Sequence, residues 1–330
     1  MWDGGRVGVR KGVWDGATVL LTGASSGIGM ELARTLAREK GIAALLLTAR
    51  REAVLTKLKQ ELQEVNPDLA VDVFPCDLGA ADGPRTLYKS VSVSHTPTVL
   101  IPNAGVGFAG GFLDGDLDTY ERIIHLNNRA MVALTHLFLP GILSAGPRGG
   151  LLFIASTSAF AGCPNFLVYS ASKAFVRAFA EGLSEECRCA GTAVAVVTPG
   201  GCRDTAFDSE AGCTVTRLAL TVGPVRVPYP TEHPRGIAKH AVRSLTKVRY
   251  WWYLWPSTTY FTYTLQQLIT APASLLFPRF LLSRLQGAVM KNSIPPAKRM
   301  KIKNLAHDAK RRRGRKQATE RTPLHRVPKS

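Results

Sequence analysis

Tyr169 and Lys173 stand four residues apart in the segment Tyr-Ser-Ala-Ser-Lys, near the middle of the sequence. On a helix this spacing places the phenol and the ammonium on one face, one turn apart. A free tyrosine titrates near about 10, so a tyrosine acid–base catalyst needs a nearby cation that favours the phenolate. A packed tyrosine beside a solvated lysine gives the same spacing by chance, and other motifs must decide between the two interpretations.

Strands and helices alternate around this pair. Buried-strand patterns are found at residues 17–22, 43–48, 69–74, 99–101, 151–155 and 192–197, and helical patterns at 30–38, 54–65, 120–143 and 166–190. This alternation predicts an α/β fold with one doubly wound parallel sheet, Rossmann-like, whose ligand crevice lies beyond the carboxyl ends of the strands. Residues 200–233 are predicted to form a loop over the crevice mouth that fits no strand well, followed by a helix at 234–246 and a last strand at 248–254.

A glycine-rich turn, Gly23-Ala24-Ser25-Ser26-Gly27-Ile28-Gly29, follows the first predicted strand. Glycines let a backbone approach a pyrophosphate, and a helix N-terminus favours an anion. The turn therefore predicts a cofactor-phosphate site, to which Ser25, Ser26 and Ile28 would contribute. A purely structural glycine turn is the alternative.

Together with Tyr169 and Lys173, this turn resembles the pattern of the short-chain dehydrogenase/reductase family. The resemblance is close over residues 16–200 and loose over the next ninety. Further motifs appear in the family's order, namely Asp77, Asn103-Ala104-Gly105, Asn127, Ser156 and Pro199-Gly200. The resemblance implies that Asp77 bonds the adenine, that the Asn-Ala-Gly element steadies the sheet under the cofactor, and that Pro199-Gly200 completes the cofactor site.

The resemblance also implies a catalytic mechanism. Tyr169 would donate its proton to a substrate carbonyl as hydride arrives, and Lys173 would bind the nicotinamide ribose and favour the phenolate. Ser156 would hydrogen-bond the substrate oxygen, and Asn127 would hold a water that passes protons toward Lys173. A strand-end hydroxyl is the alternative for Ser156, and an internal helix kink is the alternative for Asn127, which has Asn128 beside it.

Two positions depart from the family pattern. Pro102 precedes Asn103 where the family usually has a second Asn, and Asp204 stands where a threonine that contacts the nicotinamide is expected. Either a small bulge lets Thr205 take that contact, or the contact is lost.

The residues at the end of the second strand bear on cofactor choice. An NAD site places an acid there for the ribose hydroxyls, but this chain has Thr48-Ala49-Arg50-Arg51. Two guanidiniums can bind a 2′-phosphate, which predicts NADP(H), with Arg50 ahead of Arg51.

The cysteines and the N-terminus bear on the compartment. Six cysteines form no C-x-x-C pair and no zinc spacing, so we expect free thiols in a reducing compartment and no metal site. Residues 1–16, an N-terminal extension, lack the apolar core of a secretory signal. These features predict a protein that is not secreted, in the cytoplasm or on the cytoplasmic side of a membrane such as the endoplasmic reticulum.

The C-terminal part combines an apolar stretch with a basic tail. No residue between Arg249 and Arg279 is charged, and aromatic residues are frequent there. Prolines interrupt this stretch, so we expect it to lie at a bilayer interface or to line a lipid-substrate pocket. A core or dimer-interface helix is the alternative, and a true membrane span is a further one. Beyond the predicted catalytic domain at 17–290, the tail at 291–330 carries much of the net charge of +18. An anionic membrane surface is the first expectation for it, ahead of RNA or an import receptor.

The sequence therefore predicts an NADP(H)-dependent oxidoreductase that interconverts a ketone and a secondary alcohol, with reduction of a lipid-like or steroid-like carbonyl as the expected direction. It resembles the hydroxysteroid dehydrogenase, 3-ketoacyl reductase and 3-ketosphinganine reductase members of the family, which often form dimers or tetramers. A catalytically silent binding protein on the same fold, or a membrane- or RNA-associated protein acting through its tail, are the alternatives.

Overall fold

A single parallel sheet forms the centre of the computed structural model, which describes residues 13–203, 205–213, 219–222, 225–228, 231–251, 259–260, 283–284, 286 and 288–290. The strands are β1 (Ala17–Thr22), β2 (Ile42–Ala49), β3 (Ala70–Pro75), β4 (Val99–Ile101), β5 (Gly150–Ile154), β6 (Ala193–Val197) and β11 (Thr259–Tyr260). Their order is β11-β6-β5-β4-β1-β2-β3, and all neighbours pair in parallel. The predicted α/β sheet is confirmed, and its order reverses between β1 and β4, where such folds bind ligands.

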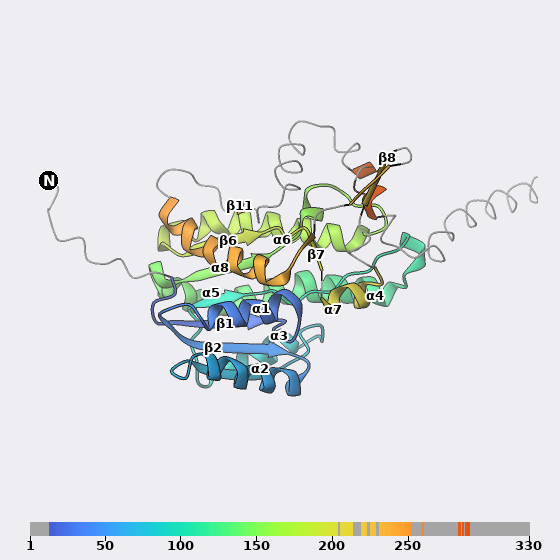
Figure 1. The fold of residues 1–330 in the computed structure, drawn as a ribbon. Coiled ribbons are helices and arrows are strands. Elements are labelled where there is room, and N and C mark those ends of the chain that lie inside the picture. Colours follow the sequence, from blue (N-terminus) through green and yellow to red (C-terminus); the bar gives the residue numbers. More distant parts are fainter. Residues whose placement is uncertain are drawn as a thin grey trace, which may run out of the picture.

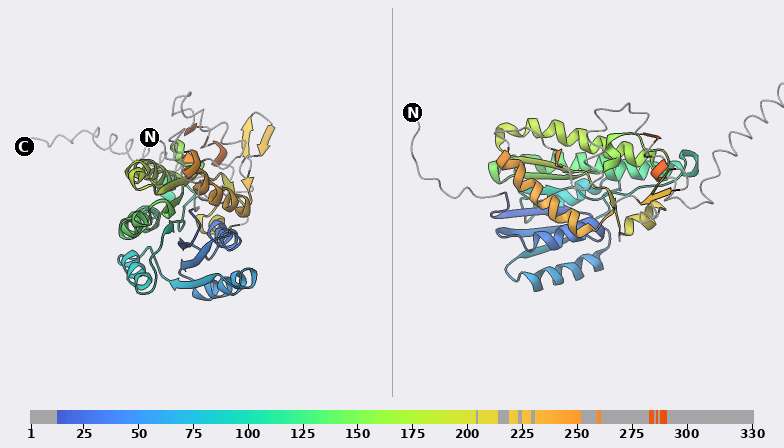
Figure 2. Two further views of the ribbon diagram at one scale, coloured as in Figure 1. Left: turned by 90° about the vertical axis from the view of Figure 1, so that its left-hand side faces the viewer. Right: turned by 45° about the horizontal axis from the view of Figure 1, so that its top comes forward.

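Helices cover both faces of this sheet (Figures 1 and 2). One face carries α1 (Gly27–Leu36), α2 (Glu52–Val65) and α8 (Pro234–Trp251), and the other carries α3 (Gly83–Ser92), α4 (Leu117–Ile124), α5 (Met131–Ser144) and α6 (Leu167–Glu186). Successive strand side chains point to opposite faces, so Leu21 and Leu47 belong to the first core layer while Leu20 and Leu46 belong to the second. Because both faces are covered, the strands are apolar almost throughout.

The long helix predicted at 120–143 is interrupted. A π-helical turn at His125–Ala130 separates α4 from α5. Such turns appear as short insertions inside α-helices, frequently at functional sites. This one contains Asn127, at the position for which an internal helix kink is the alternative interpretation.

The region after β6 differs from the prediction of a loop without strands. It contains β7 (Gly201–Cys202), α7 (Ala206–Ala211), β8 (Ala219–Val222), β9 (Val225–Pro228) and β10 (Thr231–Glu232). β8 pairs with β9 in an antiparallel hairpin, and β10 pairs with β7. Thr, Val and Leu dominate β8 and β9, and such residues favour strands once a partner strand is available.

The predicted last strand at 248–254 is wrong for its described part, since 248–251 continue α8. No proline or glycine follows Gly236 until Pro256, so nothing in the sequence ends the helix earlier. The last strand of the sheet, β11, lies farther along the chain at Thr259–Tyr260.

Several predictions fall on residues that the structure does not describe. They concern the N-terminal extension up to residue 12, Asp204, most of the apolar stretch between Arg249 and Arg279, and the basic tail at 291–330. Within the described residues, none of the helices combines the length and the apolar character that a membrane crossing requires. Membrane association therefore stays a prediction.

Candidate active site

The glycine turn connects β1 to α1 at the carboxyl edge of the sheet. Gly23 and Gly27 have φ values of +68° and +52°, in the left-handed region that favours glycine. A Cβ atom at Gly23 would lie 2.8 Å from the Cα of Ala104, so the turn also needs glycine for close backbone packing. Ser26 precedes α1, its side chain caps no backbone N–H, and the first turn of α1 contains no acidic residue. The N-terminus of α1 can therefore accept an anion.

The Asn103-Ala104-Gly105 element holds this turn against the end of β4. Asn103 Nδ2 donates to the carbonyls of Thr22 (3.0 Å) and Gly23 (3.4 Å). Thr22 Oγ1 also accepts from the backbone N–H groups of Asn103 (3.0 Å) and Ala104 (2.9 Å). These contacts form with Pro102 in place of the family's first Asn.

Gly29 shows how tightly this region is packed. A Cβ atom there would collide with the carbonyl of Gly23 and would lie 2.5 Å from Asn103 Nδ2. We expect Gly29→Ala to destabilise the fold by about 1–3 kcal/mol, as overpacking does, and to weaken cofactor binding. Thermal unfolding and a fluorescence titration with NADPH measure the two effects.

The matched control is Gly182→Ala. Gly182 lies on the exposed side of α6, and a Cβ atom there would meet nothing within 4 Å. Alanine is a better helix former than glycine, so this variant should be more stable by about 0.5–1 kcal/mol. A loss of stability as large as that of Gly29→Ala would contradict the packing explanation.

Tyr169 and Lys173 lie on the buried face of α6, together with Val176, Ala180 and Leu183. Lys173 Nζ donates to the carbonyl of Ile154 at the end of β5 (2.8 Å) and lies 5.7 Å from the centroid of the Tyr169 ring. The apolar spacing of α6 thus turns both polar side chains toward the sheet edge rather than toward water.

Burial controls the ionisation of both groups. Burial raises the pKa of Tyr169, and a hydrogen bond with Ser156 opposes this effect only in part. Burial also lowers the pKa of Lys173 to about 8. The expected stabilisation of a phenolate by Lys173 is therefore outweighed in this structure, and Tyr169 is a neutral acid that holds its proton at neutral pH. A neutral acid suits proton donation.

Ser156 ends β5 and caps the short 3₁₀ helix Thr157–Phe160. Its Oγ accepts from the backbone N–H of Ser158 (3.2 Å) and from the Ser158 hydroxyl (3.1 Å). The strand-end alternative thus describes part of its role, while its hydrogen bond with Tyr169 joins it to the site. Ser158 had no signal in the sequence that would have singled it out.

Asn127 and Asn128 have different surroundings. Asn127 is buried; its Oδ1 accepts from Val106 N (2.9 Å), and its Nδ2 donates to Val106 O (3.0 Å) and Ser172 Oγ (2.9 Å). A Cβ atom on Gly105 would lie 3.1 Å from Asn127 Oδ1 and 3.5 Å from Lys173 Nζ, so these three residues meet. Asn128 instead donates to the carbonyl of Ser172 (2.9 Å).

The two arginines after β2 also differ. Arg51 Nη2 donates to the carbonyl and to the hydroxyl of Ser25, each at 3.0 Å. Arg50 is exposed, and no hydrogen bond from its side chain to a described residue is observed. Arg51 rather than Arg50 therefore lies against the glycine turn. Asp77 is exposed just beyond β3, and its Oδ1 accepts from the N–H of Gly79 (3.0 Å).

The residues after β6 return to the same place. Pro199 O accepts from the N–H of Thr157 (2.9 Å), which ties the Pro199-Gly200 segment to Ser156. Thr205 lies over the turn, since a Cβ atom on Gly27 would be 3.2 Å from Thr205 Cγ2. The Thr205 hydroxyl is buried and has no hydrogen-bond partner among the described residues. The segment after β6 is thus tied to the end of β5 at Thr157 and lies against the glycine turn at Thr205.

An apolar layer that the sequence did not suggest covers Tyr169. The rings of Phe166 and Phe207 lie 4.3 and 5.3 Å from the Tyr169 ring, centroid to centroid, and Phe207 comes from α7. Cys163 and Cys213 belong to the same cluster, and no disulfide joins any of the six cysteines. Among the described residues, no group of His, Cys, Asp and Glu side chains could hold a metal ion.

Comparison with known proteins agrees with this fold. Residues 17–214 match the model of the short chain dehydrogenase family. A Drosophila melanogaster dehydrogenase/reductase SDR family protein 7-like is 32% identical over 188 residues, which are 56% of this chain and 57% of that protein. A Nostoc ketoacyl reductase is 30% identical over 234 residues, 71% of this chain and 78% of that protein. The chain thus spans little more than half of the fly relative.

A solved structure gives the same result. The short-chain dehydrogenase from Sphingobium yanoikuyae, in complex with NADPH, superposes with a TM-score of 0.64 and 27% identity, over 79% of this chain and 95% of that one. Because the family model covers more than half of the sequence, the chain belongs to the short-chain dehydrogenase family.

Proposed function

We propose that this protein is an NADPH-dependent oxidoreductase that reduces an apolar ketone to a secondary alcohol. The observation that carries the proposal is the buried Tyr169, hydrogen-bonded to Ser156 and one helical turn from Lys173, beside a glycine turn shaped for a phosphate. A silent binding protein would not need these groups together. NADPH, when bound, supplies the hydride.

Two observations support a dinucleotide at this site. The left-handed glycines leave the N-terminus of α1 accessible to a pyrophosphate, and the buried Thr205 hydroxyl lies over the same turn without a partner among the described residues. A buried hydroxyl of this kind calls for an explanation, and a cofactor amide would provide one. Thr205 would then take the contact that the family pattern expects one residue earlier.

The side chains of the site divide the work on the substrate. Ser156 would orient the carbonyl oxygen toward Tyr169, which would give up its proton to the oxygen as negative charge develops there. Lys173, held by Ile154, would bind the ribose hydroxyls and stabilise the phenolate left behind. Proton return would pass through the region where Gly105, Asn127 and Lys173 meet.

NADPH rather than NADH is favoured by charge. No carboxylate stands at residues 48–51, and Arg51 is already held at Ser25 beside the turn. The Sphingobium relative was solved with NADPH. We expect NADPH to bind at least tenfold more tightly than NADH in a fluorescence titration.

Substituting the arginines one at a time tests this assignment. Arg51→Ala should remove most of the preference for NADPH, because a charged hydrogen bond contributes about 1.5–3 kcal/mol. Arg50→Ala should remove less, and Lys57→Ala, an exposed cation on α2, should leave the preference unchanged. Equal affinities of the parent protein for NADPH and NADH would refute the proposed cofactor.

The class of substrate follows from the apolar layer. Phe166, Phe207 and Cys163 surround the tyrosine with apolar surface. Two relatives are a ketoacyl reductase from Nostoc and a very-long-chain 3-oxoacyl-CoA reductase from Anas platyrhynchos, the latter 32% identical over 201 residues. NADPH oxidation with a panel of 3-keto lipids, steroids and retinal would identify the best substrate. If the protein turned over none of these compounds, the result would contradict the proposal.

A further inference from the structure

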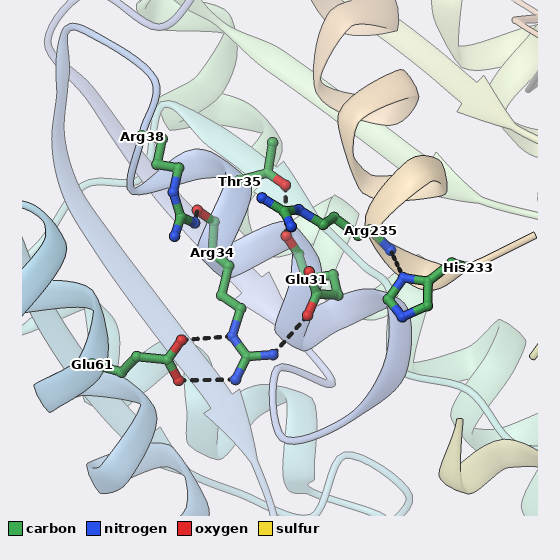
Figure 3. A network of polar contacts seen from close by, with 7 residues as sticks. All are labelled: Glu31, Arg34, Thr35, Arg38, Glu61, His233 and Arg235. Atoms are coloured by element: carbon green, nitrogen blue, oxygen red, sulfur yellow. Dashed lines mark hydrogen bonds and ion pairs between the residues drawn. The ribbon is translucent and has the colours of Figure 1, made fainter. Parts of the chain in front are cut away.

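A basic groove lies on the outer side of the molecule, between α1 and α8. Its volume is about 150 Å³. The lining residues are, from α1 and the turn after it, Glu31, Arg34, Thr35, Arg38 and Glu39 and, from α8, Arg235, Lys239 and Arg243. None of these residues belongs to the glycine turn or to the catalytic group. Figure 3 shows the polar contacts at one end of the groove.

The acidic groups near this end are already engaged. Arg34 forms a bidentate pair with Glu61 of α2, through Nε (2.7 Å) and Nη2 (2.9 Å), and its Nη1 bonds Glu31 (2.6 Å). The hydrogen bond with Glu61 raises the pKa of Arg34, and the same bond lowers the pKa of Glu61. Arg34 therefore holds both Glu31 and Glu61 through direct ion pairs, and the other cations of the groove form no ion pair with either carboxylate in the described part of the chain.

Those other cations form a stripe along α8. Arg235, Lys239 and Arg243 are spaced four residues apart, and all three are exposed. The opposite face of α8, with Ile237 and Leu245, is buried and fixes the direction in which the stripe points. No ion pair joins any of the three to an acidic group in the described part of the chain.

α1 adds a further cation, and its residues form the other side of the groove that the stripe lines. Arg38 donates to the backbone carbonyl of Arg34 (2.6 Å) and stays exposed. Figure 3 shows Arg235 reaching from α8 toward Thr35 on α1. The N–H of Arg235 donates to His233 Nδ1 (3.1 Å), which fixes the first turn of α8. Five cationic side chains thus line the groove against Glu31 and Glu39.

A purely structural explanation of the groove is incomplete. Like charges four residues apart on a helix destabilise it by about 0.2–0.5 kcal/mol per pair. The described side chains of α8 contain three such pairs, since Lys247 follows Arg243 at the same spacing. The cations also affect His240 on the same helix. Its pKa is lowered chiefly by burial and further by the charges of Arg243 and Lys247. An anion in the groove would relieve this repulsion.

The size and chemistry of the groove define the anion. A volume of about 150 Å³ is well below the ~300 Å³ at which pockets for drug-sized ligands begin. Three of the four unpaired cations are arginines, whose planar donors suit phosphate oxygens. We propose that the groove binds a phosphate group, carried either by a small free phosphate compound or by the headgroup of a lipid.

Calorimetric titration of the full chain with inorganic pyrophosphate, in low salt with NADPH at saturation, tests the proposal. The groove variant is R235Q/K239Q/R243Q. The control variant, R85Q/K89Q/R122Q, removes the same charge from exposed positions on α3 and α4 and keeps the basic tail. We expect the groove variant to bind at least tenfold more weakly than the parent, and the control to stay within twofold of it.

Two results would overturn the proposal. One is unchanged pyrophosphate affinity in the groove variant, and the other is an equal loss in both variants, which would indicate only general attraction to a basic protein. All substituted side chains are exposed, so neither variant should melt below the parent, which scanning calorimetry checks. The groove variant also loses the like-charge pairs of α8, which favours a slightly higher melting temperature.

Vesicle sedimentation then separates the two sources of phosphate. If the headgroup is the ligand, vesicles containing phosphatidylinositol 4-phosphate should retain the parent and the control variant and release the groove variant. Pure phosphatidylcholine vesicles should not distinguish the three. Pyrophosphate binding that depends on the groove, without any such difference on vesicles, would identify a free phosphate compound as the ligand.

Discussion

Tyr169→Phe lowers kcat for ketone reduction by about 10²–10⁴-fold, the usual contribution of a positioned general acid, and leaves NADPH affinity within twofold. The phenyl ring keeps its packing against Phe166 and Phe207, so the apolar layer survives the substitution. What is lost is the proton donor, which burial keeps protonated in the parent. Single-turnover oxidation of NADPH, followed by absorbance, measures the effect without interference from product release.

Tyr88→Phe is the matched control. Tyr88 lies on α3, where its ring packs against Phe138 at 5.1 Å between centroids, on the helical layer away from the glycine turn. The same atom is removed from each tyrosine, so only its position differs. Turnover in Tyr169→Phe above a tenth of the parent rate would mean that a group other than Tyr169 delivers the proton. Ser156, the polar neighbour of Tyr169, would then be the first candidate.

The sheet could be predicted because its strands are short apolar runs that end at glycine, proline or polar residues. The first strand occupies the predicted residues 17–22, and the second exceeds the predicted 43–48 by one residue at each end. Burial on both faces gives a parallel strand this continuous pattern. The family motifs then placed the glycine turn, Ser156, Tyr169 and Lys173 in one order along the chain.

The features that could not be predicted depend on contacts between distant residues. The π turn at His125–Ala130 lies in the segment His-Leu-Asn-Asn-Arg-Ala, which contains no proline or glycine to mark an irregularity, and the strands β8 and β9 pair with each other. Arg51 contacts Ser25 across 26 residues, which no local spacing reveals. The ionisation of Tyr169 also escaped prediction, because the degree of burial comes from the packing of α6 and α7.

The basic groove has the same origin. Its cations come from α1 and from α8, which lie about two hundred residues apart in the sequence. In the sequence of either helix alone, they indicate no more than a solvated charged face. Arg34 pairs with Glu31 and with Glu61 of α2, so which cations of the groove lack an acidic partner depends on which acids the fold brings close. Composition shows an excess of cations, but only the fold shows which of them lack partners.

Lys173→Met is expected to abolish ketone reduction and at the same time to stabilise the free protein at pH 7. Burial lowers the pKa of Lys173 from 10.5 to about 8, a shift that corresponds to about 3 kcal/mol of cost for the buried ammonium. Methionine fills a similar volume without charge. The substitution loses the hydrogen bond to the Ile154 carbonyl, which contributes about 1 kcal/mol. The free energy of unfolding should therefore rise by about 2 kcal/mol in total.

The dependence on pH gives this prediction its sharpest form. Between about 8 and 10.5 the unfolded parent binds the Lys173 proton and the folded parent has released it, so the parent's stability rises with pH across that window. Below pH 8 both forms hold the proton, and the parent carries the full cost. The advantage of Lys173→Met, measured by urea unfolding at pH 7 and pH 9, should therefore shrink at the higher pH.

Lys89→Met, on the exposed side of α3, should change stability by less than about 0.5 kcal/mol at either pH. The contradicting result is a Lys173→Met protein that is less stable than the parent at pH 7 and less stable by the same amount at pH 9. It would show that burial does not destabilise the ammonium. The predicted result would instead mean that the fold tolerates an unfavourable buried cation, which under the proposed function would bind the cofactor ribose and support Tyr169 during proton transfer. Such a cost at a functional group is the usual origin of a trade-off between stability and activity.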